Sequence, residues 1–585
     1  MSNPADKPLV PLRDVFFQVW KLMLKEDRRH ACGIVLLILV GTILETIGVG
    51  LIIPVVAVLG QPDSAAWPPF LHRFYGALGE PPLRGFTLWV LGGLLAAYLI
   101  KNAYLFFCTW CQARFLFAYQ AKLASKLMRL YLKSPYIYHT QHPSAELIQK
   151  IQNELSSYTL NILSSFIWIC SESFVVCGLL MVALWVNPAG AAVVFLGLII
   201  ALWGYANFFK ARIEYWGRST QENSQAIYEN IQQSLGGIKE VKIFGREEFF
   251  SSVFNRNMQE LVRYASRHYF LSQSSRNIIE LLIVGVLLGS VALLVSAGGE
   301  NKTIMPTLAF FAVAAFRLMP SAQRLLNSVN SIRYGMRSLE VLRADIIAVH
   351  ALEKVCLEPT EPLPFLSELQ IENVQFRYPE REQDVLRRVN LIISRGEMVG
   401  LQGESGVGKT TLIDIILGLL KPTNGDVLID GKSIRENVEG WRSKIGYVPQ
   451  SIRLIDDTVR RNVAFGVPDD EIDDSRVTRA LRQSQLGAFV RDHPQGVETR
   501  VGEQGKLLSG GQQQRIGIAR ALYHDPDLLI LDEATASLDL GVEAEIVETL
   551  KSLKGDKTMI IISHRTSTLK DCDTQYKLRE GQLWR

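Results

Sequence analysis

Six apolar runs of about twenty residues dominate the first half of the chain. A run of this length crosses the ~30 Å hydrocarbon core of a bilayer as one helix. Lipid offers no partner to a free backbone polar group, so a spanning segment of this kind must be helical. The pattern therefore predicts a membrane bundle of six transmembrane helices, centred on residues 32–58, 86–108, 160–186, 189–209, 277–297 and 303–321.

The connections between these runs differ in length and charge. Asn187 and Pro188 alone separate the third run from the fourth, which predicts an antiparallel hairpin. The stretches 109–159 and 210–276 are long, helical in pattern and rich in Lys and Arg. The positive-inside rule places them in the cytoplasm with both termini. We expect the membrane helices to continue beyond the bilayer and to touch a soluble domain near Ser134–Ser144 and near Gln221–Gly237.

Composition changes along the chain predict four parts. Residues 1–30 are expected to form a cytoplasmic or interfacial helix, because Leu12, Phe16, Trp20 and Leu24 share one helical face. The transmembrane domain with its extensions follows at 31–345, and a Pro-containing linker at 346–368. Residues 369–585 alternate short β-rich segments with helices, as in a soluble α/β domain. The net charge of +4 is small and not gathered in a stripe, so no nucleic-acid partner is expected.

The soluble half carries a phosphate-binding pattern between an apolar strand and a helix. Its residues are Gly403, Glu404, Ser405, Gly406, Val407, Gly408, Lys409, Thr410 and Thr411. This fits G-x-x-x-x-G-K-[ST], in which glycines let backbone N–H groups close around phosphate oxygens. Lys409 supplies positive charge to the β and γ phosphates, and the Thr410 hydroxyl is placed for Mg²⁺. The sequence thus predicts ATP and Mg²⁺ as cofactors.

Two acids end a later apolar strand, Leu528–Glu533. Asp532 suits Mg²⁺ coordination, and Glu533 suits polarising the water that attacks the γ-phosphate. Taken alone, two carboxylates at a strand end are as readily explained as solvated turn residues. The phosphate loop in the same domain favours the catalytic interpretation.

A second anion site precedes another helix. Ser509 offers a hydroxyl at the helix N-terminus, and Gly510 and Gly511 expose backbone N–H groups, with Gln512 following. One domain thus has two phosphate sites. This favours an arrangement in which nucleotide is bound between two such domains.

These motifs together resemble the ATP-binding cassette (ABC) superfamily, and the resemblance covers almost the whole chain. It implies that Tyr378 stacks on adenine and that Gln450 senses Mg²⁺ and couples to the membrane domain. It also implies that His564 holds the γ-phosphate and that Asp539, in Ala-Ser-Leu-Asp, lies in a loop that crosses a dimer interface. The implied fold is a helical membrane bundle plus an α/β cassette. Both halves of the nucleotide site look intact, which favours a homodimer.

The order of the domains resembles ABC exporters, and motifs in the membrane half are similar to those of bacterial lipid-linked oligosaccharide flippases. The motifs are Glu45–Pro54, Tyr131–Tyr136, Ser144–Leu147, Gly237–Lys242 and Arg317–Ser321. The resemblance implies ATP-driven translocation of a lipid-linked oligosaccharide or similar anionic amphiphile across the bacterial inner membrane. A multidrug, lipid A or glycolipid exporter is the alternative, since it would share every cassette residue. A channel or regulator using the same cassette is a third.

Three basic residues, Lys101, Arg276 and Arg317, lie in or near the apolar runs. Charge at membrane depth usually faces a cavity, and cations there suit a pyrophosphate head group. Snorkelling, or pairing with an acid, explains them equally well. The candidate acids are Glu45, Glu172 and Glu280.

The first outer loop, Trp67–Gly79, has apolar residues at helical spacing. This predicts a short external amphipathic helix. It would either contact a polyprenyl tail or only rest on the outer leaflet.

Overall fold

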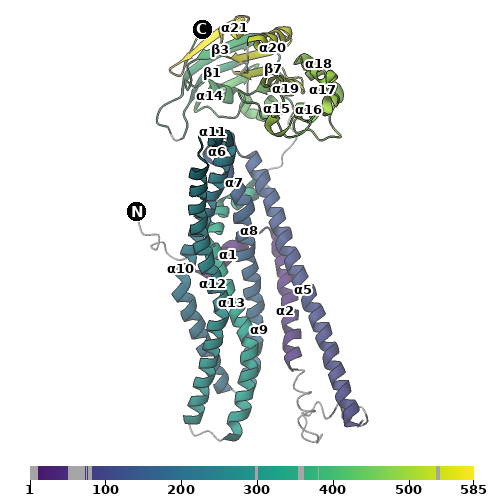
Figure 1. The fold of residues 1–585 in the computed structure, drawn as a ribbon, viewed down its shortest axis with the longest axis vertical. Helices are drawn as coiled ribbons and strands as arrows, with labels where there is room; N and C mark the ends of the chain where they lie inside the picture. The colour runs from purple at the N-terminus through teal and green to yellow at the C-terminus, as the bar shows by residue number, and fades with distance from the viewer. Residues whose placement is uncertain are drawn as a thin grey trace. The chain divides into compact units, whose positions relative to one another are not determined.

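The computed structural model describes residues 11–50, 73, 75–76, 79, 82–186, 188–296, 301–352, 361–379, 381–534 and 540–585. The chain divides into two compact units (Figure 1). One comprises residues 1–134 and 141–356, and the other residues 135–140 and 357–585. The predicted helix at Trp67–Gly79 lies almost entirely outside the described residues.

The first unit is helical, and each of the six predicted spans overlaps one of its long helices; residues 51–58 of the first span and residue 297 of the fifth lie outside the described residues. Four of these helices are 49 to 52 residues long. At ~1.5 Å per residue such a helix is about 75 Å long, more than twice the hydrocarbon thickness. The expectation that the membrane helices continue well beyond the bilayer is therefore confirmed. The helices are α2 (Lys25–Gly50), α5 (Leu83–Lys133), α9 (Ser164–Val186), α10 (Pro188–Gly236), α12 (Glu247–Ser296) and α13 (Asn301–Leu352).

Two of the described stretches, Arg84–Lys133 and Ser144–Met181, are apolar and long enough to cross a membrane. The apolar parts of α10, α12 and α13 include side chains outside the described set. Helix α9 ends at Val186 and α10 begins at Pro188, as the predicted hairpin requires.

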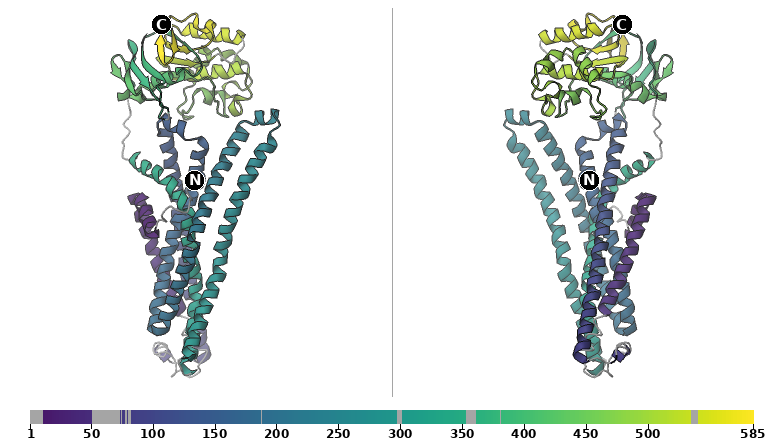
Figure 2. Two further views of the ribbon diagram at one scale, coloured as in Figure 1. Left: turned by 90° about the vertical axis from the view of Figure 1, so that its left-hand side faces the viewer. Right: turned by 90° about the vertical axis from the view of Figure 1, so that its right-hand side faces the viewer.

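Helix α10 packs along α12 and α13 (Figure 2). Buried Ile213, Ile279 and Leu326 form the centre of this contact. Gly217 of α10 permits the close approach, since a Cβ there would lie 2.1 Å from the carbonyl oxygen of Tyr334 on α13. The pair is thus fixed by small-residue packing as well as by apolar burial.

A buried ionic cluster joins α5, α7 (Ser144–Gln149) and α13. The Lys150 ammonium lies 3.0 Å from Glu146 and 3.4 Å from Asp345. The Tyr131 hydroxyl donates to the same Asp345 carboxylate at 2.8 Å. Lys150 begins the first of two π-helical stretches, Lys150–Glu154 and Tyr158–Leu163, which lead through α8 (Leu155–Ser157) into α9. Pairing offsets the desolvation of these charges.

The N-terminal helix α1 (Leu12–Leu22) is present as predicted from its periodicity. Val15, Val19 and Leu22 are buried against the protein, whereas Phe16 and Phe17 are exposed. Its position at the membrane surface stays a prediction.

The second unit contains two sheets. The antiparallel sheet has the order β2-β1-β4-β5, and the larger sheet has the order β10-β9-β3-β8-β7-β6. In the larger sheet β3, β8, β7 and β6 are parallel, so their carboxyl ends meet at one edge. The strands are β1 (Glu368–Phe376), β2 (Leu386–Ser394), β3 (Met398–Gly403), β4 (Asn424–Ile429), β5 (Lys432–Ser433), β6 (Ile445–Val448), β7 (Leu528–Asp532), β8 (Thr558–Ile562), β9 (Thr574–Arg579) and β10 (Gln582–Trp584).

Two apolar cores flank the larger sheet. Strands β7 and β8 are buried along their whole length, as expected of central strands covered on both faces. The helices are α14 (Lys409–Ile416), α15 (Val438–Arg442), α16 (Val459–Val463), α17 (Asp474–Gln483), α18 (Gly487–Asp492), α19 (Gly510–Leu522), α20 (Leu540–Leu553) and α21 (Thr566–Leu569).

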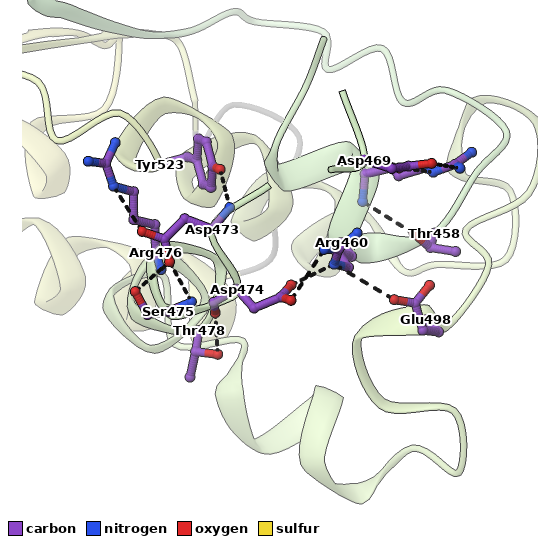
Figure 3. Close-up of polar contacts among 11 residues, drawn as sticks. Thr458, Arg460, Asp469, Asp473, Asp474, Ser475, Arg476, Thr478, Glu498 and Tyr523 are labelled. Carbon is purple, nitrogen blue, oxygen red and sulfur yellow. Dashed lines mark hydrogen bonds and ion pairs between the residues drawn. The ribbon is translucent and has the colours of Figure 1, made fainter. Parts of the chain in front are cut away.

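Polar contacts hold α16, α17 and α19 together (Figure 3). The Arg460 guanidinium lies 2.5 Å from Asp474 and 3.9 Å from Glu498. The Asp473 carboxylate caps the N-terminus of α17. The backbone N–H of Asp473 donates to the Tyr523 hydroxyl at 3.0 Å. Tyr523 directly follows α19, so these contacts fix the helix whose other end carries Ser509.

Residues Pro135–Thr140 belong to this second unit although they lie between membrane helices in the sequence. They include most of α6 (Tyr136–Gln141), and Ile137 packs against the core that contains β1 and α14. The contact predicted near Ser134–Ser144 is confirmed for this part. The contact predicted near Gln221–Gly237 stays a prediction.

Candidate functional site

The loop between β3 and α14 has the geometry of a phosphate cradle. Gly406 and Gly408 have φ of +79° and +110°, a region that favours glycine. A Cβ at Gly408 would lie 3.0 Å from Val385, whereas one at Gly406 would meet nothing within 4 Å. The tip at Glu404–Gly406 is exposed, and Val407 packs into the core below. The loop is thus anchored at one side and open at the other, where phosphate oxygens would bind.

The Lys409 side chain lies inside this loop. Its ammonium donates to the carbonyl oxygens of Gly403 at 2.7 Å and Glu404 at 3.1 Å. It also lies 3.1 Å from Nε2 of His564. Burial lowers the pKa of Lys409, while the carboxylates of Glu533 and Asp532 oppose this shift. The cation is therefore held where it faces both acids and the loop.

Glu533 lies at the centre of a chain of polar contacts. Its Oε1 is 3.0 Å from Nε2 of His564, and its Oε2 accepts a hydrogen bond from Nε2 of Gln450 at 2.7 Å. The backbone at Glu533 has φ of +48°, a conformation strained for a residue with a Cβ. Its N–H donates to Ile562 of β8 at 3.0 Å, which holds the strained turn in place. Four residues predicted from separate motifs, Gln450, Glu533, His564 and Lys409, thus form one contiguous set.

Asp532 ends β7 and is 8% exposed. Burial raises its pKa, and the neighbouring Glu533 charge raises it further. A divalent cation would supply the missing positive charge. The predicted oxygen donors, which are Asp532, the exposed Thr410 and the Gln450 amide, suit Mg²⁺ by type, since it prefers oxygen ligands. The residues present therefore fit that cofactor.

Tyr378 lies near the start of α14. Its hydroxyl is 3.2 Å from Oγ1 of the buried Thr411, and its ring contacts Phe376 edge-on with centroids 4.9 Å apart. The contact with Thr411 ties the aromatic predicted to stack on adenine to the helix that follows the phosphate loop.

Two residues beside Asp532 escaped the sequence analysis. Burial, followed by the nearby Asp532 charge, raises the pKa of Tyr447, and Asp414 of α14 is buried nearby. Burial, with the Asp532 charge, raises the pKa of Asp414 to about 6. An acid inside the apolar run Leu412–Ile416 was the signal that could have identified Asp414.

Ser509 and Gln512 form a reciprocal cap at the start of α19. The Gln512 N–H donates to the Ser509 hydroxyl at 3.3 Å, and the Ser509 N–H donates to the Gln512 side chain at 2.9 Å. Ser509 and Gly510 are exposed and Gly511 is half-buried. Within the described part of the chain, no hydrogen bond joins residues 509–512 to the phosphate loop. Asp539 lies outside the described residues.

The three membrane cations remain candidates only. Lys101 lies over the Tyr98 ring at 4.3 Å, Arg276 is exposed on α12, and the Arg317 side chain is outside the described set. Glu172 is paired with Arg324 at 2.7 Å. Sequence analysis missed Arg324, although it lies seven residues after Arg317 on the same face of α13.

Comparisons with known proteins agree with this geometry. The family model described as ABC transporter matches residues 386–536, and the one described as ABC transporter transmembrane region matches 31–318. An ATP-dependent lipid A-core flippase of Ralstonia nicotianae is 30% identical over 79% of this chain and 78% of its own. The protein of the same name from Thiobacillus denitrificans is 27% identical over 90% of this chain and 91% of its own.

A solved structure of a bacterial Atm1-family ABC exporter with ATP bound superposes with a TM-score of 0.76. It is 23% identical, and the match covers 95% of this chain and 94% of that one. At this identity the likeness shows the fold.

Proposed function

Because the chain belongs to the ABC transporter family, whose members are multi-pass membrane proteins driven by ATP hydrolysis, we propose that it is a homodimeric exporter. Its substrate would be a lipid-linked oligosaccharide or a similar anionic amphiphile, moved across the bacterial inner membrane. The cassette and both termini would lie in the cytoplasm. The observation that supports a dimer is that one chain has two separate anion-binding segments, the phosphate loop and the N-terminus of α19.

Among the described residues of one chain, no hydrogen bond joins the phosphate loop to the Ser509–Gln512 segment. The Ser509–Gln512 cap is satisfied internally, and Ser509 and Gly510 at the N-terminal end of α19 are exposed. A helix N-terminus with free N–H groups attracts phosphate. We propose that these groups bind the γ-phosphate held by Lys409 of a second copy, which completes two equivalent sites.

An exposed apolar surface on α11 (Ile238–Ile243) supports the same assembly. Ile243 and the adjacent Phe244 are each 68% exposed, and Ile238 is 45% exposed. Apolar groups of this size on a short helix between α10 and α12 favour docking on another protein surface. We propose that this surface binds the cassette of the second copy.

The proposed hydrolysis uses the contiguous set around Glu533. Lys409 binds the β and γ phosphates, and His564 donates to the γ-phosphate. Mg²⁺, held by Asp532, Thr410 and Gln450, would neutralise phosphate charge. Glu533 orients the attacking water and accepts its proton, and its contacts with Gln450 and His564 set the direction of the carboxylate. Tyr378 positions the base, and Asp539 acts at the interface between the copies.

The two relatives named above are lipid A-core flippases, so their names support an anionic amphiphile as the substrate and fit the lipid A alternative equally well. The basic residues Lys101, Arg276 and Arg317 support a head group that carries phosphate. The alternative is a multidrug, lipid A or glycolipid exporter. Purified protein in vesicles would be given a polyprenyl-pyrophosphate saccharide, lipid A or an apolar drug, and ATP hydrolysis and flipping would be measured. Stimulation and flipping by the pyrophosphate-linked saccharide alone support the proposal. Stimulation by lipid A or the drug alone replaces it with the alternative.

A further inference from the structure

A buried acid on α20 binds the segment that directly follows His564. Glu543 is 2% exposed and lies in the first turn of the helix. Its Oε1 accepts hydrogen bonds from Ser567 at 2.6 Å and Thr568 at 3.0 Å, and its Oε2 is bonded to the Arg565 guanidinium. One carboxylate thus receives three donors from four consecutive residues.

These contacts strongly favour an ionised Glu543. Burial alone would raise its pKa, but the hydrogen bonds from Ser567, Arg565 and Thr568 outweigh burial and hold the pKa below its usual value. Removing the charge would weaken the bonds that this carboxylate makes to the half-buried Arg565 guanidinium and to the two hydroxyls. The segment 565–568 therefore depends on Glu543 for its position.

The same segment is short and directly continuous with His564. Strand β8 ends at Ile562, and the Arg565 N–H donates to the Ser563 hydroxyl at 3.0 Å. The His564 side chain is 51% exposed, so little packing restrains it. Its ring nevertheless lies 3.0 Å from Glu533 and 3.1 Å from Lys409. The backbone at His564 is therefore held before this residue by β8 and after it by the bonds to Glu543.

We propose that Glu543 is a positioning residue for ATP hydrolysis, which holds the segment 565–568 so that His564 stays aligned with Glu533 and the γ-phosphate. This inference rests on the role proposed above for His564. It also connects that role to α20, the helix that follows Asp539.

The test uses the full-length protein in vesicles with Mg²⁺ and ATP. Glu543→Gln keeps the shape of the side chain but removes the charge. We expect kcat to fall about tenfold to a hundredfold, because a small misplacement of reacting groups has an effect of this size. The KM for ATP should stay within about twofold of the wild-type value. Glu545→Gln is the matched control, because Glu545 lies on the same helix but is exposed and pairs with Arg515. It should leave kcat unchanged.

A double-mutant cycle separates positioning from general stability. If Glu543 acts through His564, Glu543→Gln will add little to the loss caused by His564→Ala. Full additivity of the two losses, or an unchanged kcat in Glu543→Gln, would overturn the proposal. If Glu543→Gln does not fold, Thr568→Val removes one donor and should lower kcat in the same direction, and an unchanged kcat there would also overturn it.

The cycle also distinguishes the two levels of inference. If His564→Ala alone hydrolyses ATP normally, the role proposed for His564 fails whatever Glu543 does. If His564→Ala is inactive but Glu543→Gln is fully active, only the positioning role fails.

Discussion

Nε2 of His564 lies 3.0 Å from Oε1 of Glu533, so the two residues meet although they come from the ends of different strands. Gln450 occupies the other oxygen of the same carboxylate at 2.7 Å. Both oxygens of the proposed base are thus in use. A water that donates a proton to Glu533 must compete with one of these neighbours, which makes the direction of this carboxylate sensitive to both.

Glu533→Gln should abolish turnover and trap an ATP-bound dimer. The amide keeps the hydrogen-bonding shape but cannot accept a proton at neutral pH, so we expect kcat to fall at least about a hundredfold. Phosphate release measures turnover, and size-exclusion chromatography with Mg²⁺ and ATP measures the dimer. Glu471→Gln, an exposed residue between α16 and α17, is the control. Normal hydrolysis by Glu533→Gln would refute the assigned role.

Mixed dimers test the shared nucleotide site. Lys409→Ala and Ser509→Ala should each inactivate a homodimer, since every site needs both groups. In a mixed dimer, one site combines both changes and the other has neither. Co-expression with two affinity tags should therefore restore about half of the wild-type ATPase activity.

Loss of the Ser509 cap also costs about 1 kcal/mol of helix stability, so the melting temperature of each variant is measured as well. A mixed dimer that stays inactive, although both parents fold, would show that each chain uses its own two motifs.

The sequence predicted the parts of this site that depend on local pattern. The phosphate loop, the acids after β7 and the cap at Ser509 each occupy one short stretch, so a few neighbouring residues define them. Likewise, long apolar runs predicted the membrane helices, because lipid leaves no alternative backbone structure.

Contacts between distant segments could not be predicted in the same way. Glu543 lies in a helix whose other acids, such as Glu545 and Glu548, are exposed, so nothing local distinguishes it as buried. The bond between Gln450 and Glu533 joins residues 83 apart in sequence. Burial and pairing at such positions depend on how β6, β7 and β8 align, which single-sequence periodicity does not specify.

Arg317→Ala should weaken the response to a pyrophosphate-linked lipid. A guanidinium that binds a phosphate contributes about 1.5–3 kcal/mol, so the lipid concentration for half-maximal stimulation of ATPase should rise roughly tenfold or more. Arg263→Ala is the control, because Arg263 is exposed and pairs with Glu260 at 3.4 Å. An unchanged lipid response in Arg317→Ala would remove this residue from the substrate site.

Gly217→Ala should destabilise the contact between α10 and α13. The new Cβ would lie 2.1 Å from the Tyr334 carbonyl oxygen, so the helices must separate, at a cost of about 1–3 kcal/mol. Gly204→Ala lies on the same helix where a Cβ meets nothing within 4 Å. It should gain up to ~1 kcal/mol from helix propensity. Thermal unfolding in detergent compares them, and equal midpoints would contradict the close approach.

Asp430→Asn should make the stability of the protein less dependent on acid pH. The Asp430 carboxylate accepts backbone hydrogen bonds from Leu366, Ser367 and Glu368 at 2.7, 2.8 and 2.9 Å. Burial opposes ionisation, but these three N–H donors outweigh it and hold the pKa of Asp430 below its usual value.

The folded pKa is thus lower than the unfolded value of about 3.9, so the stabilisation is complete above that pH and is lost as pH falls through the folded pKa. Asparagine keeps one acceptor and tolerates the left-handed backbone at this position, where φ is +49°. We expect Asp430→Asn to lower the free energy of unfolding by about 1 kcal/mol at neutral pH, allowing for solvent screening, and by less near pH 3. Denaturant unfolding of the full chain at both pH values measures this difference. Asp470→Asn, at an exposed site, should change neither, and a loss that is the same at both pH values would show that the Asp430 charge does not hold the start of β1.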